Sequence, residues 1–176
     1  MIPASTPEAQ FTDWLEEHGA IVRKLSLAYA PMAADTADLH QEMLVQLWRS
    51  LPRFQGQAKV STWIYRVCLN TALTWRRGEN RRLARIVAEP APLPVAASEH
   101  TGPAEVHARR DLHDQLLQAV RMLPPAERTV CVLALDGLAY AEIAQVTGMT
   151  ENHVGVALSR ARQKLSQIMK GISDEL

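Results

Sequence analysis

Hydrophobic residues recur every three or four positions along most of the chain, which is the period of amphipathic helices. Residues 8–30 carry them on one stripe: Phe11, Trp14, Leu15, His18, Ile21, Val22, Leu25 and Tyr29. Nothing in the first 88 residues alternates with period two over a useful length, as a half-buried strand would. The pattern predicts an all-α fold.

Prolines and capping residues divide the first half into three helices. Pro31 and Pro52 end the first two, and Asp35 and Ser61 are the expected caps of the second and third. The predicted segments are a helix over 36–51, a loop over 54–60 and a third helix that buries Ile64, Val67, Cys68, Thr71, Ala72 and Trp75. Together they make one small helical domain, which we place at residues 8–88.

A second small helical domain is expected at residues 107–172, after a linker. Residues 89–106 hold four prolines, several alanines, no Lys or Arg and no aromatic residue, so a Pro/Ala-rich extended linker is predicted. The predicted helices of the second domain are one carrying Leu112, Leu116, Ala119, Val120 and Leu123, then 126–135, 140–147 and 150–169. The last two, joined by a turn at Gly148, have helix-turn-helix spacing.

Charge is balanced overall but clustered locally. The chain has 19 basic and 19 acidic side chains, so it is neither a polybasic coat for nucleic acid nor an acidic tail. One basic cluster follows the third helix and another lies on the last: Arg76, Arg77, Arg81, Arg82 and Arg85, then Arg160, Arg162, Lys164 and Lys170. Such clusters suit phosphates, which position a protein on DNA without specifying sequence.

The sequence offers nothing for catalysis, so we expect no enzyme, no cofactor and no metal. The closest glycines are seven residues apart, which excludes a phosphate-binding glycine loop, and the histidines form no H-E-x-x-H motif. Cys68 and Cys131 form no C-x-x-C pair, as fits a reducing cytoplasm. No signal peptide or membrane span is predicted, so we expect a cytoplasmic protein.

One face of the third helix carries side chains suited to unpaired DNA. Trp63, Arg66, Asn70 and Thr74 lie opposite its buried stripe. An exposed aromatic ring stacks on any base, and a neighbouring Arg suits the backbone. Whether Trp63 binds a base or belongs to the core is left open by the pattern.

Several segments, in order, resemble the bacterial sigma-70 family in its extracytoplasmic-function (ECF, group 4) form. They are DLHQE at 38–42 followed by LWR at 47–49, STWIYRVCLN at 61–70 followed by Arg76 and Arg77, and LPPAER at 123–128, GLAYAEIAQ at 137–145 and SRAR at 159–162. Each is weak alone, since many regulators carry a helix-turn-helix, but the ordered set is specific.

The resemblance implies a sigma factor that binds core RNA polymerase, at its β′ clamp helices and β flap, and directs it to promoter DNA. The first domain would be region 2, which recognises and opens the −10 element, and the second region 4, which reads the −35 element. Control by an anti-sigma factor is also implied. The residues carried over are Asp38, Gln41, Glu42 and Trp48 for polymerase, Phe54, Lys59, Ser61, Trp63, Arg66, Asn70, Arg76 and Arg77 for −10 DNA, and Thr150, Asn152, His153, Val156, Ser159, Arg160 and Arg162 for −35 DNA.

The chain departs from the family within the expected recognition helix. Gly155, Val156 and Ala157 stand where group 4 members usually have a basic or polar run, so −35 binding is expected to weaken or to shift towards Arg160 and Arg162. The alternative function is a stand-alone helix-turn-helix transcriptional regulator whose N-terminal bundle senses a partner. A helical module that binds only proteins is a further alternative.

Overall fold

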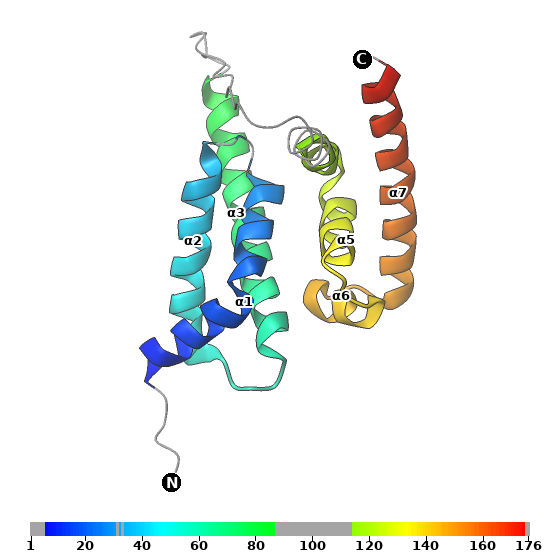
Figure 1. Cartoon of the computed structure of the whole chain (residues 1–176). Coiled ribbons are helices and arrows are strands. Elements are labelled where there is room, and N and C mark those ends of the chain that lie inside the picture. The colour runs from blue at the N-terminus through cyan, green and yellow to red at the C-terminus, as the bar shows by residue number, and fades with distance from the viewer. Residues whose placement is uncertain (1–5, 31, 33, 87–113, 175–176) are drawn as a thin grey trace, which may run out of the picture.

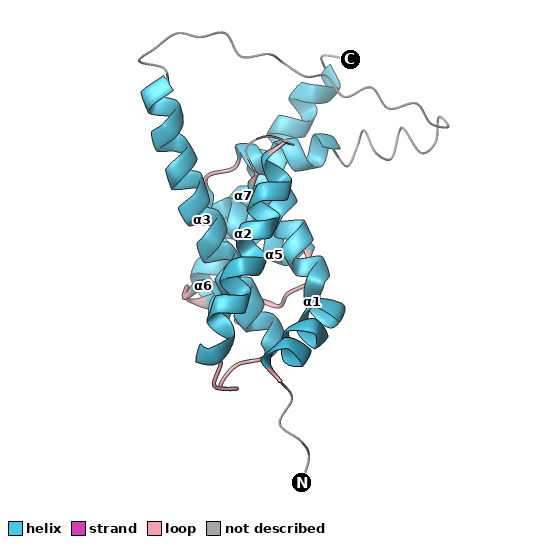
Figure 2. Cartoon of the chain, turned by 90° about the vertical axis from the view of Figure 1, so that its left-hand side faces the viewer, coloured by secondary structure: helices cyan, strands magenta, loops and turns pink. Residues whose placement is uncertain are grey.

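The structure, a computed structural model, describes residues 6–30, 32, 34–86 and 114–174, and their side chains except at 79–86 and 172–174. Every regular element in these ranges is a helix, as Figure 2 shows, which confirms the all-α prediction. The predicted linker at 89–106, the domain boundaries beside it, and Leu112 lie outside the described residues, as do the side chains of Arg81, Arg82 and Arg85.

The first domain is a bundle of three long helices, α1 (Pro7–Tyr29), α2 (Asp35–Ser50) and α3 (Val60–Ile86), each packed against the other two (Figure 1). A 3₁₀ turn, η1 (Leu51–Arg53), follows α2. The core of the bundle is formed by the stripes that the hydrophobic pattern predicts. Its members include Val22, Leu25, Leu39, Met43, Leu47, Ile64, Cys68 and Ala72.

Both capping predictions in this domain are wrong in detail. Asp35 is the first residue of α2 rather than its cap, and its carboxylate accepts a hydrogen bond from the backbone N–H of Met32 at 3.2 Å. Ser61 lies inside the first turn of α3, which begins at Val60. A helix can start a residue early when loop carbonyls accept its first bonds, as the carbonyl of Lys59 does from the N–H of Trp63.

The second domain contains a helical segment at 114–122, α5 (Pro125–Leu135), α6 (Tyr140–Thr147) and α7 (Glu151–Asp174). Gly137 and Gly148 form its turns with φ of 86° and 75°, a left-handed conformation that favours glycine. The hydroxyl of Thr150 accepts a hydrogen bond from the N–H of His153, so it caps α7. The helix-turn-helix α6–α7 is therefore confirmed.

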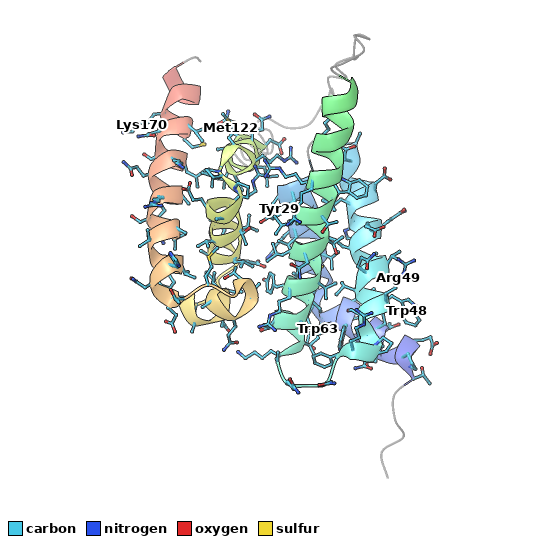
Figure 3. All side chains as sticks on the ribbon, turned by 180° about the vertical axis from the view of Figure 1, so that it is seen from behind. Tyr29, Trp48, Arg49, Trp63, Met122 and Lys170 are labelled. Carbon is cyan, nitrogen blue, oxygen red and sulfur yellow. The ribbon has the colours of Figure 1, made fainter. Side chains whose placement is uncertain are left out.

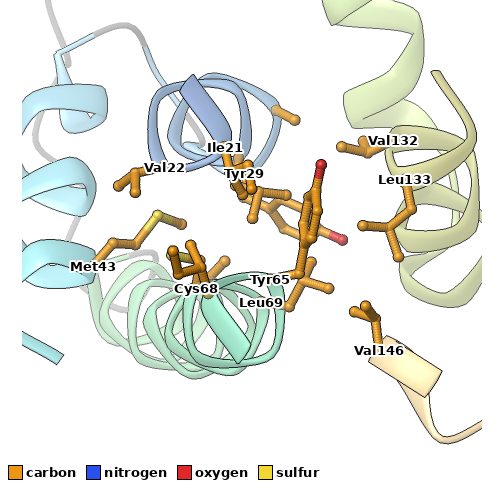
Figure 4. Packing of buried hydrophobic residues seen from close by; sticks show 14 of the residues in the cluster. Ile21, Val22, Tyr29, Met43, Tyr65, Cys68, Leu69, Val132, Leu133 and Val146 are labelled. Atoms are coloured by element: carbon orange, nitrogen blue, oxygen red, sulfur yellow. The ribbon is translucent and has the colours of Figure 1, made fainter. Parts of the chain in front are cut away.

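The two domains pack directly against each other. Helix α3 contacts α6, and the buried hydrophobic residues of both domains form one continuous cluster. In Figure 4, Tyr29 and Tyr65 of the first domain lie between their own bundle and Val132, Leu133 and Val146 of the second. Within the described ranges, no helix is apolar over enough length to cross a membrane.

Candidate nucleic-acid and partner interfaces

An exposed face of α2, which we call the polymerase face, carries Asp38, Gln41, Val45 and Trp48 at helical spacing. The Trp48 ring is 40% exposed and meets Phe11 of α1 edge-on, with 5.2 Å between ring centroids. A large aromatic side chain held in place yet open to solvent is typical of an anchor for a protein partner. The face thus combines one acidic group with an apolar anchor.

Two residues of α2, Val45 and Glu42, differ from what the sequence predicts for the polymerase face. Val45 was not predicted as a contact, yet it is 41% exposed and lies beside Trp48. Its position three residues before Trp48, which places both on one face of the helix, is the sequence signal that could have identified it. Glu42 is half-buried and accepts a 2.7 Å hydrogen bond from Gln46 one turn later, so it lies at the edge of the face. His40 is half-buried.

The outer face of α3, which we call the strand face, carries Trp63, Arg66, Asn70 and Thr74. The last three are exposed as predicted, whereas Trp63 is half-buried. Its indole N–H donates to the Ser50 hydroxyl at 3.1 Å, and its ring contacts Phe54 edge-on at 5.6 Å. Trp63 is therefore held by these contacts without being fully buried, which lies between the two possibilities that the sequence left open.

The loop before α3 is held by its aromatic residue. Phe54 is half-buried between Trp14 and Trp63, with 5.0 Å between its ring centroid and that of Trp14. Ser61 is half-buried in the first turn of α3, and Lys59 is exposed at the end of the loop. Gly56 turns the loop with φ of 71°.

The polymerase face and the strand face adjoin. Glu42, Gln46, Asn70, Thr71, Thr74 and Trp75 line one groove of about 380 Å³ between α2 and α3. Its walls carry carboxylate, amide, hydroxyl and indole groups, set in a lining that is mainly apolar. A residue predicted for the polymerase, Glu42, and one predicted for DNA, Asn70, thus share a single surface depression.

Several predicted −10 residues are engaged with the second domain. The guanidinium of Arg66 donates two hydrogen bonds, of 3.0 and 2.5 Å, to the backbone carbonyl of Gln145 in α6. Lys59 pairs with Glu142 of α6 at 3.0 Å, and its hydrogen bond holds the pKa of Glu142 below the usual value. Arg76 is half-buried and close enough to Arg128 of α5 to help lower the pKa of that guanidinium, whereas Arg77 is exposed.

Arg128 has a structural role within the LPPAER segment. Its guanidinium donates to the backbone carbonyls of Arg121 and Leu123, where the helix at 114–122 ends, and only 2% of the residue is exposed. Burial, more than its charged neighbours, lowers the pKa of Arg128 to about 10. The side chain lies 5.8 Å from the ring centroid of Tyr29, a cation–π contact across the two domains.

The outer face of α7, which we call the recognition face, is open as predicted. All seven predicted −35 residues are exposed: Thr150, Asn152, His153, Val156, Ser159, Arg160 and Arg162. Behind them Val154, Leu158 and Ala161 are buried against the rest of the domain. The helix therefore presents a side with polar and basic residues to solvent over several turns. Figure 3 places Lys170 near the end of this helix.

Two residues expected on the outside of α7 are otherwise engaged. Gly155 is half-buried, and a Cβ added there would lie 3.5 Å from the ring of Tyr140 in α6. Lys164, expected to be a phosphate contact, pairs with the buried Glu127 of α5 at 2.8 Å. A buried carboxylate needs a charge partner, and sequence spacing cannot reveal one that lies 37 residues away.

Two family models match the chain, and together they cover more than half of it. They are Sigma-70 region 2, at residues 14–82, and Sigma-70, region 4, at residues 113–165. The sequence is 29% identical over 163 residues to the ECF RNA polymerase sigma factor SigG of Mycobacterium tuberculosis, covering 81% of this chain and 44% of SigG. It is 29% identical over 150 residues to the ECF RNA polymerase sigma-E factor of Escherichia coli K12, covering 82% of this chain and 78% of that protein.

Two solved structures share the fold. The sigma factor RpoE of Bartonella quintana, in complex with the anti-sigma factor NepR, aligns with a TM-score of 0.70 at 17% identity, over 92% of this chain and 97% of that chain. CnrH in complex with the cytosolic domain of CnrY aligns with a TM-score of 0.63 at 23% identity, over 92% and 88%. The chain spans less than half the length of SigG but most of sigma-E and of both structural neighbours. With both family regions matched in order and each folded as a helical domain, the chain belongs to the sigma-70 family, as an ECF sigma factor, a class of non-enzymatic proteins of transcription initiation.

Proposed function

We propose that this chain binds core RNA polymerase, directs it to promoters with −35 and −10 elements, and helps to open the DNA strands. The observation that carries the proposal is the polymerase face of α2 adjoining the strand face of α3 across one groove. A sensory bundle would have no reason to present an exposed anchor for a protein next to side chains suited to unpaired bases. We propose that the chain acts in the cytoplasm, where polymerase and promoter DNA are found.

The polymerase face supports binding through a small apolar centre with a polar rim. Trp48 and Val45 would be buried by the β′ clamp helices, because exposed aromatic and apolar side chains supply most of the binding energy of an interface. Asp38 and Gln41 are exposed around them and would set orientation by charge and hydrogen bonding. Region 4 would contact the β flap.

Strand opening would draw on binding energy alone. A base leaving the duplex loses stacking worth a few kcal/mol, which an aromatic ring and a backbone cation can replace. The Trp63 ring is only half-buried, Phe54 and Lys59 lie on the loop that would hold a displaced base, and Ser61 follows in the first turn of α3. Arg66 and Asn70 would contact the displaced strand, and Arg76 and Arg77 its backbone.

The recognition face would lie in the major groove of the −35 element. Asn152 and Ser159 are the polar side chains suited to base edges, and Arg160 and Arg162 suit phosphates. Thr150, at the helix start, and His153 would contact the backbone, and Val156 a thymine methyl group. Because Gly155 has no side chain to offer and Lys164 is paired with Glu127, phosphate binding is expected to rest on Arg160 and Arg162.

Binding to sigma-free core RNA polymerase tests the proposal. The purified chain should co-elute with core polymerase on a sizing column, and Trp48→Ala should weaken the complex about tenfold or more, as loss of an aromatic anchor does. Arg49→Ala, an exposed neighbour of Trp48, is the matched control and should co-elute like the wild type. A folded protein that never co-elutes would contradict the proposal and favour a free DNA-binding regulator.

We also propose control by an anti-sigma factor. Support comes from the RpoE structure, which is a complex with an anti-sigma factor and aligns with nearly the whole of this chain. A tagged chain recovered from its native cells before and after stress should carry a further protein that competes with polymerase. Recovery of polymerase subunits alone under both conditions would count against this control.

A further inference from the structure

The middle of the recognition face of α7 differs in chemistry from its two ends. Residues 152–159 contain no Lys, Arg, Asp or Glu, so the basic part of this helix begins only at Arg160. Val156 lies within this stretch, with Asn152 one turn before it and Ser159 one turn after it. Polar side chains therefore flank an apolar one on the surface proposed to enter the major groove.

Val156 is an apolar side chain that the core of the domain does not use. It is 42% exposed, whereas Val154 and Leu158, two positions away on either side, are buried and pack α7 against its domain. A β-branched residue in a helix has one strongly preferred side-chain rotamer. The two methyl groups of Val156 are therefore held in place before any partner arrives, and they remain open to one.

The surroundings of Val156 add no polar side chain on its own turn. Gly155 has no side chain, and Ala157 is half-buried and ends in a methyl group. A Cβ added at Gly155 would lie 3.5 Å from the ring of Tyr140, which is itself 42% exposed, so an aromatic ring borders this position. The surface around Val156 is therefore largely apolar, and DNA can approach it closely.

The base edges of a major groove offer one apolar group that matches such a surface, the C5 methyl group of thymine. Guanine, adenine and cytosine present acceptors or amino donors, which an aliphatic side chain cannot satisfy. The step from Asn152 to Ser159 spans roughly 10 Å at about 1.5 Å per residue, or about three base pairs at about 3.4 Å each. Val156 would therefore meet the base pair between those that Asn152 and Ser159 contact.

We propose that Val156 determines the specificity of region 4 by selecting −35 elements with thymine at the central contacted base pair, through the C5 methyl group. Thymine there buries its methyl group against the two methyl groups of Val156. Guanine or cytosine at the same place would leave a polar group facing an aliphatic side chain, at a cost in desolvation. The inference rests on the proposed function of the recognition face and adds the base that its DNA site must carry.

Replacing thymine by deoxyuridine tests the proposal, because it removes the methyl group and keeps the hydrogen bonds of the base pair. The free full chain is used, since its recognition face is exposed. Selection at low salt from random-sequence duplexes about two helical turns long identifies the preferred site. Each thymine of that site is then replaced singly. We expect one replacement to weaken binding about fourfold, the usual worth of one buried methyl group.

Three variants identify the side chain that reads the methyl group. Val156→Ala should bind the thymine and deoxyuridine duplexes equally, at the weaker of the two wild-type affinities. Leu135→Ala removes an exposed apolar side chain of α5 outside the recognition face, so this control should keep the fourfold difference. Val156→Arg should enrich guanine in place of thymine, because arginine pairs with the O6 and N7 atoms of guanine. Circular dichroism checks that every variant is folded.

The outcomes separate this inference from the function on which it rests. A selection that enriches no thymine, or a wild type that binds both duplexes alike at every position, would overturn the role of Val156. A methyl effect that persists in Val156→Ala would also overturn it, because another residue would then read the group. Polymerase co-elution and its dependence on Trp48 test the proposed function independently. If co-elution fails while the methyl effect is found, Val156 reads thymine in the site of a free regulator, and only the −35 assignment is lost.

Discussion

The two surfaces proposed to bind DNA differ in how much of each is available in the free chain. On α7 every predicted contact residue is exposed, whereas on α3 Arg66 is bonded to the second domain and the loop residue Lys59 is paired with it. The difference follows from position. Helix α7 packs by one side only, while α3 is packed by α1, α2 and α6. Availability for binding therefore depends on tertiary contacts that the residue types do not reveal.

The largest expected effect is a loss of stability when a buried side chain behind the recognition face is truncated. Leu158 is 2% exposed in α7, so Leu158→Ala should destabilise region 4 by about 2–5 kcal/mol. All four tryptophans lie in region 2, so urea unfolding followed by Trp fluorescence reports that domain while circular dichroism reports both. Ser159→Ala, the exposed neighbour, is the control. If the domains are coupled through their contact, the fluorescence transition should also move to lower urea, and an unmoved transition would mean independent domains.

The next effect tests whether the half-buried ring of Trp63 binds a base. In polymerase complexes Trp63→Ala should cost about 1–3 kcal/mol of strand binding, the usual worth of one stacked base, and −10 thymines should lose permanganate reactivity. Ser50→Ala removes the hydrogen-bond partner of the indole and keeps the ring, so reactivity should persist. Normal reactivity in Trp63→Ala would assign the ring to the core alone.

On the recognition face of α7, we expect substitutions of basic residues to weaken the electrostatic attraction to DNA. Arg160→Ala or Arg162→Ala should weaken duplex binding across sequences and reduce the slope of log affinity against log salt by about 1 each. Gln163→Ala on the same helix should leave the slope unchanged, and Asn152→Ala should alter preference at one base position. Unchanged binding in both Arg variants would remove their phosphate role.

The smallest effect is a gain in stability. Gly155→Ala should stabilise α7 by up to about 1 kcal/mol, because alanine is the better helix former and the added Cβ would make ordinary contact with Tyr140 at 3.5 Å. Thermal unfolding of region 4 measures the gain. Gly148→Ala is the contrasting variant, since φ of 75° there should make it destabilising. A loss of stability in Gly155→Ala would show that Tyr140 cannot accommodate the methyl group.

Much of the fold could be predicted because periodicity reports burial within a helix. The stripes of α1 and α3 and the turn at Gly148 follow from spacing and turn chemistry alone. The caps at Asp35 and Ser61 were wrong because a helix start depends on which loop groups meet the first turn. That information lies in tertiary geometry rather than in local sequence.

The candidate site was predictable as helix faces but not as contacts. Exposure of Asp38, Asn70 and Arg160 follows from helical position. The partners of Arg66 and Lys164 lie 79 and 37 residues away, and no local pattern encodes such pairs. The same limit hid the hydrogen bonds that Asp136 accepts from Lys24 and from the hydroxyl of Tyr65.

Energy transfer between the two domains, measured with and without polymerase, tests whether polymerase binding separates domains that are packed together in the free chain. Donor and acceptor dyes would be placed at Ala20→Cys in α1 and Ser166→Cys in α7, both exposed positions. Cys68 and Cys131 are buried, and burial raises the pKa of Cys68 to about 12, so neither should react at neutral pH. We expect high transfer in the free chain and lower transfer once core RNA polymerase binds. Low transfer in the free chain, or high transfer that persists with saturating polymerase, would contradict it.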